Sequence, residues 1–143
     1  MAEKWVDLGK PDMIGHDYTI YYHIGKRAWM KFDHDRRASA MNTAIKPDMN
    51  FDWPHDNEVY TDIYLWKKSK LHGVIFSPLT HLCIGIKHGI GMTGGAFHKT
   101  YLERYKNLDP YYRFLEQYMD ADSFKFYTSN ENYFATPVEG PSK

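Results

Sequence analysis

Hydrophobic and polar positions alternate along residues 17–24 of the chain. Every second residue there is apolar or aromatic, namely Tyr18, Ile20, Tyr22 and Ile24. This alternation predicts a strand, because successive side chains of a strand point to opposite faces. An extended arm lying on a partner protein would give the same pattern. Residues 1–15 are interrupted by glycine and proline, so we expect an extended, loop-rich N-terminal arm.

Apolar residues spaced three and four apart predict short helices elsewhere in the chain. One is expected at about residues 35–45, and Pro47 would end it. Residues 46–58 hold many turn-forming residues and predict a loop. Residues 100–107 predict another helix, and Asp109-Pro110 is typical of the start of the next. An apolar stripe marks that last helix, formed by Tyr111, Phe114, Leu115, Tyr118 and Met119.

The longest run with almost no charge covers residues 73–97, in which Lys87 is the only charged residue. A helix over this run would be about 37 Å long, and the hydrocarbon core of a bilayer is about 30 Å thick. Before the run, Tyr64 and Trp66 are followed by lysines, an order typical of a membrane interface. A solvated basic turn before a core helix would give the same order. We therefore predict a mainly α chain with one transmembrane helix at about 70–97 and amphipathic flanking helices.

Three parts of the chain follow from this prediction. Residues 1–66 form an N-terminal arm outside the membrane, residues 67–98 the transmembrane helix, and residues 99–143 a helical C-terminal segment outside the membrane. The 143 residues carry a formal net charge of zero, which argues against a nucleic-acid-binding protein. Cys83 is the single cysteine, so the chain has neither an internal disulfide nor a cysteine-based zinc site.

Candidate chemistry lies on one face of the predicted transmembrane helix. At about 100° per residue, a narrow sector gathers His81, Gly85, His88, Met92 and Gly95. A histidine with a glycine one turn further along suits haem, since the imidazole binds iron and the glycine leaves room for the macrocycle. Alternatively, the histidines bond to neighbouring helices and the glycines only allow close packing.

The run from Phe76 to His88 resembles the second transmembrane helix of the cytochrome b anchor subunit of succinate dehydrogenase, respiratory complex II. That helix carries His, three residues, then Gly-Ile-Arg-His, and here the corresponding run is His81-Leu-Cys-Ile-Gly85-Ile-Lys87-His88. The resemblance implies that His81 is an axial ligand of haem b and that His88 lies near the haem propionates. Lys87 stands in place of the family's arginine. Met92 stands where the family has an acidic residue, and the family has three membrane helices.

The resemblance implies an anchor subunit in the mitochondrial inner membrane that helps bind haem b. It would help pass electrons from succinate oxidation, a step of the tricarboxylic acid cycle, to ubiquinone at a site shared with other subunits. Expected partners are the second anchor subunit, the iron–sulfur subunit, the flavoprotein and lipid, but no nucleic acid. On this reading the chain is a non-catalytic subunit of an oxidoreductase.

Two other functions remain open from the sequence. The first is a single-span accessory subunit of another respiratory complex or of ATP synthase, without a cofactor. The second is a soluble metal-dependent enzyme whose ligands come from the three His-Asp pairs at residues 16–17, 34–35 and 55–56.

Overall fold

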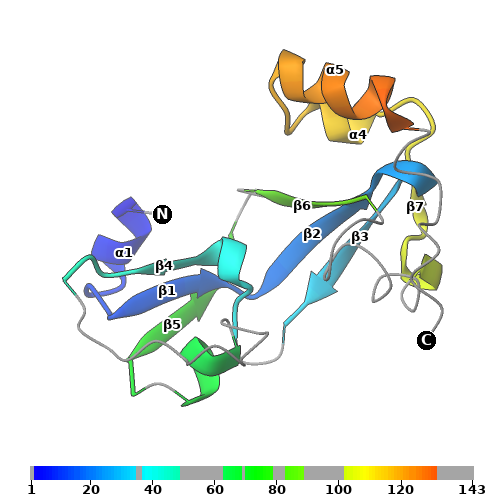
Figure 1. The fold of residues 1–143 in the computed structure, drawn as a ribbon. Coiled ribbons are helices and arrows are strands. Elements are labelled where there is room, and N and C mark those ends of the chain that lie inside the picture. The colour runs from blue at the N-terminus through cyan, green and yellow to red at the C-terminus, as the bar shows by residue number, and fades with distance from the viewer. Residues whose placement is uncertain are drawn as a thin grey trace, which may run out of the picture. The chain divides into compact units, whose positions relative to one another are not determined.

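The computed structural model describes residues 2–34, 37–48, 63–68, 70–78, 83–88 and 102–131 (Figure 1). The chain divides into two compact units. Unit 1 comprises Met1–Thr19 and Phe32–Cys83, and unit 2 comprises Ile20–Lys31 and Ile84–Lys143. Each unit is built around its own small sheet.

Unit 1 contains a three-stranded sheet in the order β4-β1-β5. The middle strand pairs antiparallel with β4 and parallel with β5, and Figure 1 shows the three side by side. The elements of the unit are α1 (Ala2–Asp7), β1 (Met13–His16), a 3-10 turn (Ala40–Asn42), β4 (Thr43–Ile45), a π-helical turn (Tyr64–Lys68) and β5 (Gly73–Phe76).

The central strand β1 is buried along its whole length, because neighbours cover both of its faces. Gly15 is required there by close packing. A Cβ at this position would lie 2.3 Å from the Cβ of Ala38 and 2.7 Å from Cζ2 of Trp66. Trp66 is held in turn by its indole N–H, which donates to Oγ1 of Thr43 at 3.0 Å. The strand is thus packed tightly on one side, and α1 lies near its beginning.

Unit 2 is organised on a four-stranded sheet in the order β6-β2-β3-β7. The pairing of β2 with β6 is parallel, and that of β3 with β7 is antiparallel. The elements are β2 (Tyr18–His23), a 3-10 turn (Ile24–Lys26), β3 (Ala28–Asp33), β6 (Ile84–Lys87), a second 3-10 turn (Leu102–Arg104), β7 (Asn107–Leu108), α4 (Arg113–Glu116) and α5 (Ala121–Ser129).

The core of unit 2 is rich in aromatic rings. Tyr22, Ile24 and Leu115 are fully buried at its centre. The ring of Phe114 stacks on that of Trp29 with centroids 4.3 Å apart. The strand predicted at residues 17–24 is confirmed by β2, which covers Tyr18–His23. Tyr22 and Ile24, on the apolar side of that alternating pattern, are buried in the core.

A buried carboxylate joins this core to the helix α4. Oδ2 of Asp109 accepts hydrogen bonds from the Tyr22 hydroxyl at 3.1 Å and from the backbone N–H groups of Phe114 at 3.1 Å and Leu115 at 3.2 Å. Asp109 was predicted to cap a helix beginning at Pro110. It does satisfy N–H groups of α4, but the helix begins three residues later, at Arg113.

The prediction of a mainly α chain with a transmembrane helix at about 70–97 was wrong. Gly73–Phe76 and Ile84–Lys87 are strands of two different sheets. Within the described part of the chain, no helix combines the length and the apolar character that crossing a membrane requires. An apolar run without clear periodicity fits a buried strand as well as a helix, and here strand pairing accounts for its apolar residues.

The flanking predictions also need correction. The N-terminal arm begins with the helix α1 and continues as the strand β1. A helix was predicted at residues 35–45, but residues 40–45 form a 3-10 turn and a strand, so the prediction was wrong there. The helix predicted at 100–107 is replaced, where described, by a 3-10 turn and β7. Trp66, expected at a membrane interface, is half-buried inside unit 1.

Candidate ligand-binding pocket

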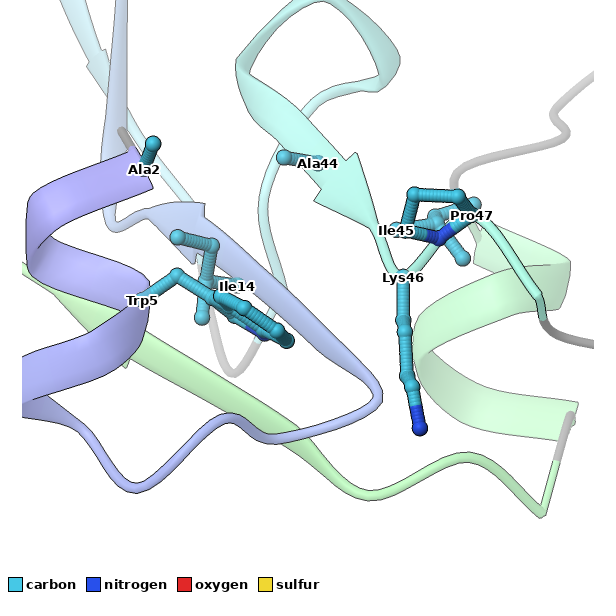
Figure 2. Close-up of a pocket in the computed structure, with 7 residues that line it drawn as sticks. All are labelled: Ala2, Trp5, Ile14, Ala44, Ile45, Lys46 and Pro47. Atoms are coloured by element: carbon cyan, nitrogen blue, oxygen red, sulfur yellow. The ribbon is translucent and has the colours of Figure 1, made fainter.

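A pocket of about 360 Å³ lies in unit 1 between α1 and the β4 side of the sheet. Its described lining is almost entirely apolar and consists of Ala2, Trp5, Ile14, Ala44, Ile45, Lys46 and Pro47 (Figure 2). Ile14 is only 1% exposed, whereas Ala2, Lys46 and Pro47 are exposed. The pocket therefore has a buried apolar floor and a rim that faces solvent. Its volume falls in the usual range for small-molecule sites, about 300–1,000 Å³.

Trp5 forms the aromatic wall of the pocket, and its position is fixed by its own hydrogen bond. The indole N–H donates to the carbonyl oxygen of Pro11 at 2.8 Å, so the polar edge of the ring is satisfied and the rest is available for apolar contact. The chain can return to Pro11 because two residues with positive φ follow α1, Gly9 at 78° and Lys10 at 55°. The ammonium of Lys10 lies 5.9 Å from the centroid of the Trp5 ring.

The opposite wall comes from β4 and the turn that follows it. Ala44 is the antiparallel partner of Ile14, so their side chains share one face of the sheet. One further backbone bond, from Lys46 N–H to the carbonyl oxygen of Asp12 at 2.9 Å, extends this pairing. Figure 2 shows Lys46 across the pocket from Trp5, with its side chain extended. Lys46 is the one charged residue among the described lining residues.

A second candidate site is a polar network in the core of unit 1, centred on Thr19. The Thr19 hydroxyl donates to Oγ of Ser39 at 2.8 Å and accepts from Nδ2 of Asn42 at 2.9 Å. It also lies 2.8 Å from Nε2 of His34. Because the single hydroxyl proton goes to Ser39, Nε2 of His34 must donate to Thr19. Thr19 is fully buried, so a substrate has no access to this hydroxyl.

Cys83 extends the same network without forming a nucleophilic pair. Its thiol donates to Oδ1 of Asn42 at 2.6 Å, and burial raises the pKa of the thiol. Thr19 and Asn42 stand between Cys83 and His34 in this chain of contacts. A thiol with a raised pKa is mostly protonated near neutral pH and is a weak nucleophile. The network therefore stabilises the core of unit 1.

The structure also locates the residues that the sequence assigned to a haem site. His81 lies outside the described residues. Gly85 is buried in the middle of β6, opposite Tyr21, and Lys87 lies on the same face of the strand. The Lys87 ammonium sits 4.6 Å from the centroid of the Tyr21 ring, and burial lowers its pKa. His88 follows the end of β6 and is half-buried.

The haem assignment of these residues stays a prediction. The binding of ubiquinone, the electron-transfer role, the partner subunits with lipid, and the mitochondrial location also stay predictions.

Of the three His-Asp pairs, only residues 16–17 are described completely. His16 is 2% exposed and packs edge-on against Phe76. Among the described residues, no group of three His, Cys, Asp or Glu side chains lies close enough to hold a metal ion.

The pocket residues were missed by sequence reasoning because residues 1–15 were expected to be extended. One signal did point to a helix there. Ala2, Glu3 and Lys4 favour a helix, and Gly9 followed by Pro11 two residues later marks a helix end. Nothing in the sequence connects Trp5 with Lys46, since they meet only through the pairing of β1 with β4.

Comparisons of the chain with protein-family models, curated proteins and solved structures found no match. The resemblance to the cytochrome b anchor subunit is therefore without support from relatives. It is also contradicted by the fold, because two strands occupy parts of the segment that would have to be one helix. The identification of the chain as a cytochrome b anchor subunit with a transmembrane helix was therefore wrong.

Proposed function

We propose that this chain is a binding protein for a small apolar molecule, which it holds in the pocket between α1 and β4. The observation that carries the proposal is the pocket's combination of a buried floor at Ile14, an indole wall at Trp5 and a volume of about 360 Å³. An apolar surface with few polar groups is the usual lining of small-molecule sites.

The volume limits the size of the ligand. At about 30 Å³ for each water-sized group, the pocket holds about twelve non-hydrogen atoms. Burial of a hydrocarbon contributes about 0.8 kcal/mol per methylene group, from which the cost of association is subtracted. For a ten-carbon chain we expect a dissociation constant of about 10–100 μM, equivalent to about 5.5–7 kcal/mol.

A pocket-filling substitution tests the proposal. Ala44→Phe places a ring in the pocket from the wall opposite Trp5, and we expect it to weaken binding of 1-decanol at least about tenfold. Val6→Phe is the matched control, because Val6 lies on α1 next to Trp5 but is 54% exposed and is not among the described lining residues. Binding is measured by calorimetry, and circular dichroism checks that both variants fold.

Two results would contradict the proposal. One is the absence of measurable 1-decanol binding by the unmodified chain up to the solubility limit of 1-decanol. The other is equal affinity of Ala44→Phe and the unmodified chain, because a ligand unaffected by a ring at Ala44 is bound elsewhere.

A further inference from the structure

We infer that the ligand of this pocket is an amphipathic anion, a carboxylate on an apolar chain of about eight to twelve carbons. The inference rests on the proposed binding function and adds the chemistry of the headgroup. It follows from the position of a single charged side chain, Lys46, at the rim of a pocket that is otherwise apolar.

The charge of Lys46 is available to a ligand. Its side chain is exposed, and its ammonium forms no ion pair with any of the described residues. The backbone of Lys46 is held by its N–H, which donates to the carbonyl oxygen of Asp12. The side chain takes no part in that hydrogen bond. The acidic residues of α1, Glu3 and Asp7, are exposed and are not among the described lining residues.

A second ammonium, that of Lys10, lies beside Trp5, although Lys10 is not among the described lining residues. Nζ of Lys10 lies 5.9 Å from the centroid of the Trp5 ring, so a cation is placed beside the aromatic wall. Attraction between a cation and the face of an indole holds such a side chain near the ring. A negative headgroup at the rim would therefore meet Lys46, the charged residue of the described lining.

The separation of floor and rim sets the orientation of the ligand. The floor at Ile14 is 1% exposed and offers no charged partner from the described lining, so the hydrocarbon chain points inward. The carboxylate stays at the exposed rim, where it keeps part of its hydration and pairs with Lys46. One lining ammonium matches one negative charge, which favours a carboxylate over a doubly charged phosphate monoester.

Three ten-carbon probes test the headgroup. Calorimetry compares decanoate, 1-decanol and decylammonium on the full chain at low salt. We expect decanoate to bind about fivefold more tightly than 1-decanol, the size of a partly exposed ion pair, and decylammonium to bind most weakly. The preference for decanoate should shrink in 0.5 M salt, because salt screens exposed charges.

Lys46→Met is the decisive variant, since methionine keeps an unbranched apolar stem and removes the charge. It should bring the affinity of the variant for decanoate down to its affinity for 1-decanol. Lys46→Arg should keep the preference. Lys70→Met is the control, because Lys70 is exposed in unit 1 and is not among the described lining residues.

The outcomes separate the inference from the function on which it rests. Equal affinities of decanoate and 1-decanol for the unmodified chain would overturn the anionic headgroup and leave the apolar pocket standing. An unchanged preference in Lys46→Met would remove Lys46 as the partner of the headgroup. Failure of all three probes to bind would refute the binding function itself.

Discussion

Asp109→Ala is expected to lower the free energy of unfolding by about 3 kcal/mol. The side chain is 7% exposed, and one oxygen, Oδ2, accepts three hydrogen bonds. Their donors are the Tyr22 hydroxyl and the backbone N–H groups of Phe114 and Leu115, at 3.1 to 3.2 Å. A buried donor that loses its partner costs about 1–3 kcal/mol. Water entering the vacated space offsets part of that cost, so we expect a loss of about 1 kcal/mol for each of the three donors.

Two matched variants distinguish burial from capping alone. Asp109→Asn keeps an oxygen acceptor and loses only the charge, so a loss of about 1–2 kcal/mol is expected. Asp120→Ala removes an exposed acceptor of similar geometry, because Oδ1 of Asp120 accepts from the N–H groups of Asp122 at 3.1 Å and Ser123 at 2.9 Å. Its effect should be clearly smaller than that of Asp109→Ala, since water replaces the lost contacts.

Urea titration followed by circular dichroism measures the stability of each variant. Amide hydrogen exchange at Phe114 and Leu115 reports the local change, because these two N–H groups lose their acceptor in Asp109→Ala. The reasoning fails if Asp109→Ala costs less than about 1 kcal/mol or no more than Asp120→Ala. Either result would mean that burial of the Asp109 carboxylate adds little to the free energy lost on its removal.

Two further predictions concern unit 1. Gly15→Ala should destabilise the chain by about 3 kcal/mol in a urea titration, because the added Cβ would lie 2.3 Å from the Cβ of Ala38. Gly9→Ala, whose Cβ meets nothing within 4 Å, should cost only about 1 kcal/mol for its positive φ, and equal costs would contradict the packing argument. Burial lowers the pKa of His16 below 6.5, the unfolded value, so the unfolded state takes up the proton first. Stability should therefore fall as pH drops below about 6.5, and a His16→Phe variant that keeps the same pH dependence would exclude His16 as its source.

Local pattern was sufficient for some elements of this fold. Residues 17–24 alternate, and β2 forms there with Tyr22 and Ile24 in the core. The stripe on the last predicted helix was partly correct, since Leu115 is fully buried and Phe114 packs beside it, whereas Tyr111 is 78% exposed. In each correct case, the side chains that face the core are close in sequence, so their spacing carries the information.

The candidate site depends on contacts between residues that are far apart in the sequence. Trp5 and Ile14 meet Lys46 because β1 pairs with β4, about thirty residues further along the chain. No spacing within one segment encodes that pairing, and the short helix that places Trp5 was missed because Gly9 and Pro11 were interpreted as part of an extended arm. Strand pairing depends on partners distant in sequence, which is why β propensity depends strongly on context.

By itself, the sequence determined that residues 73–97 form a run with almost no charge, which favours burial. Only the tertiary structure decided how, by making Gly73–Phe76 an edge of one sheet and Ile84–Lys87 an edge of another. The physical reason is that apolar character favours burial without specifying the surroundings, so the same residues suit a bilayer, a helix core or a sheet. The pairing of these strands with β1 and β2 supplied the hydrogen-bond partners and the cover that decided between them.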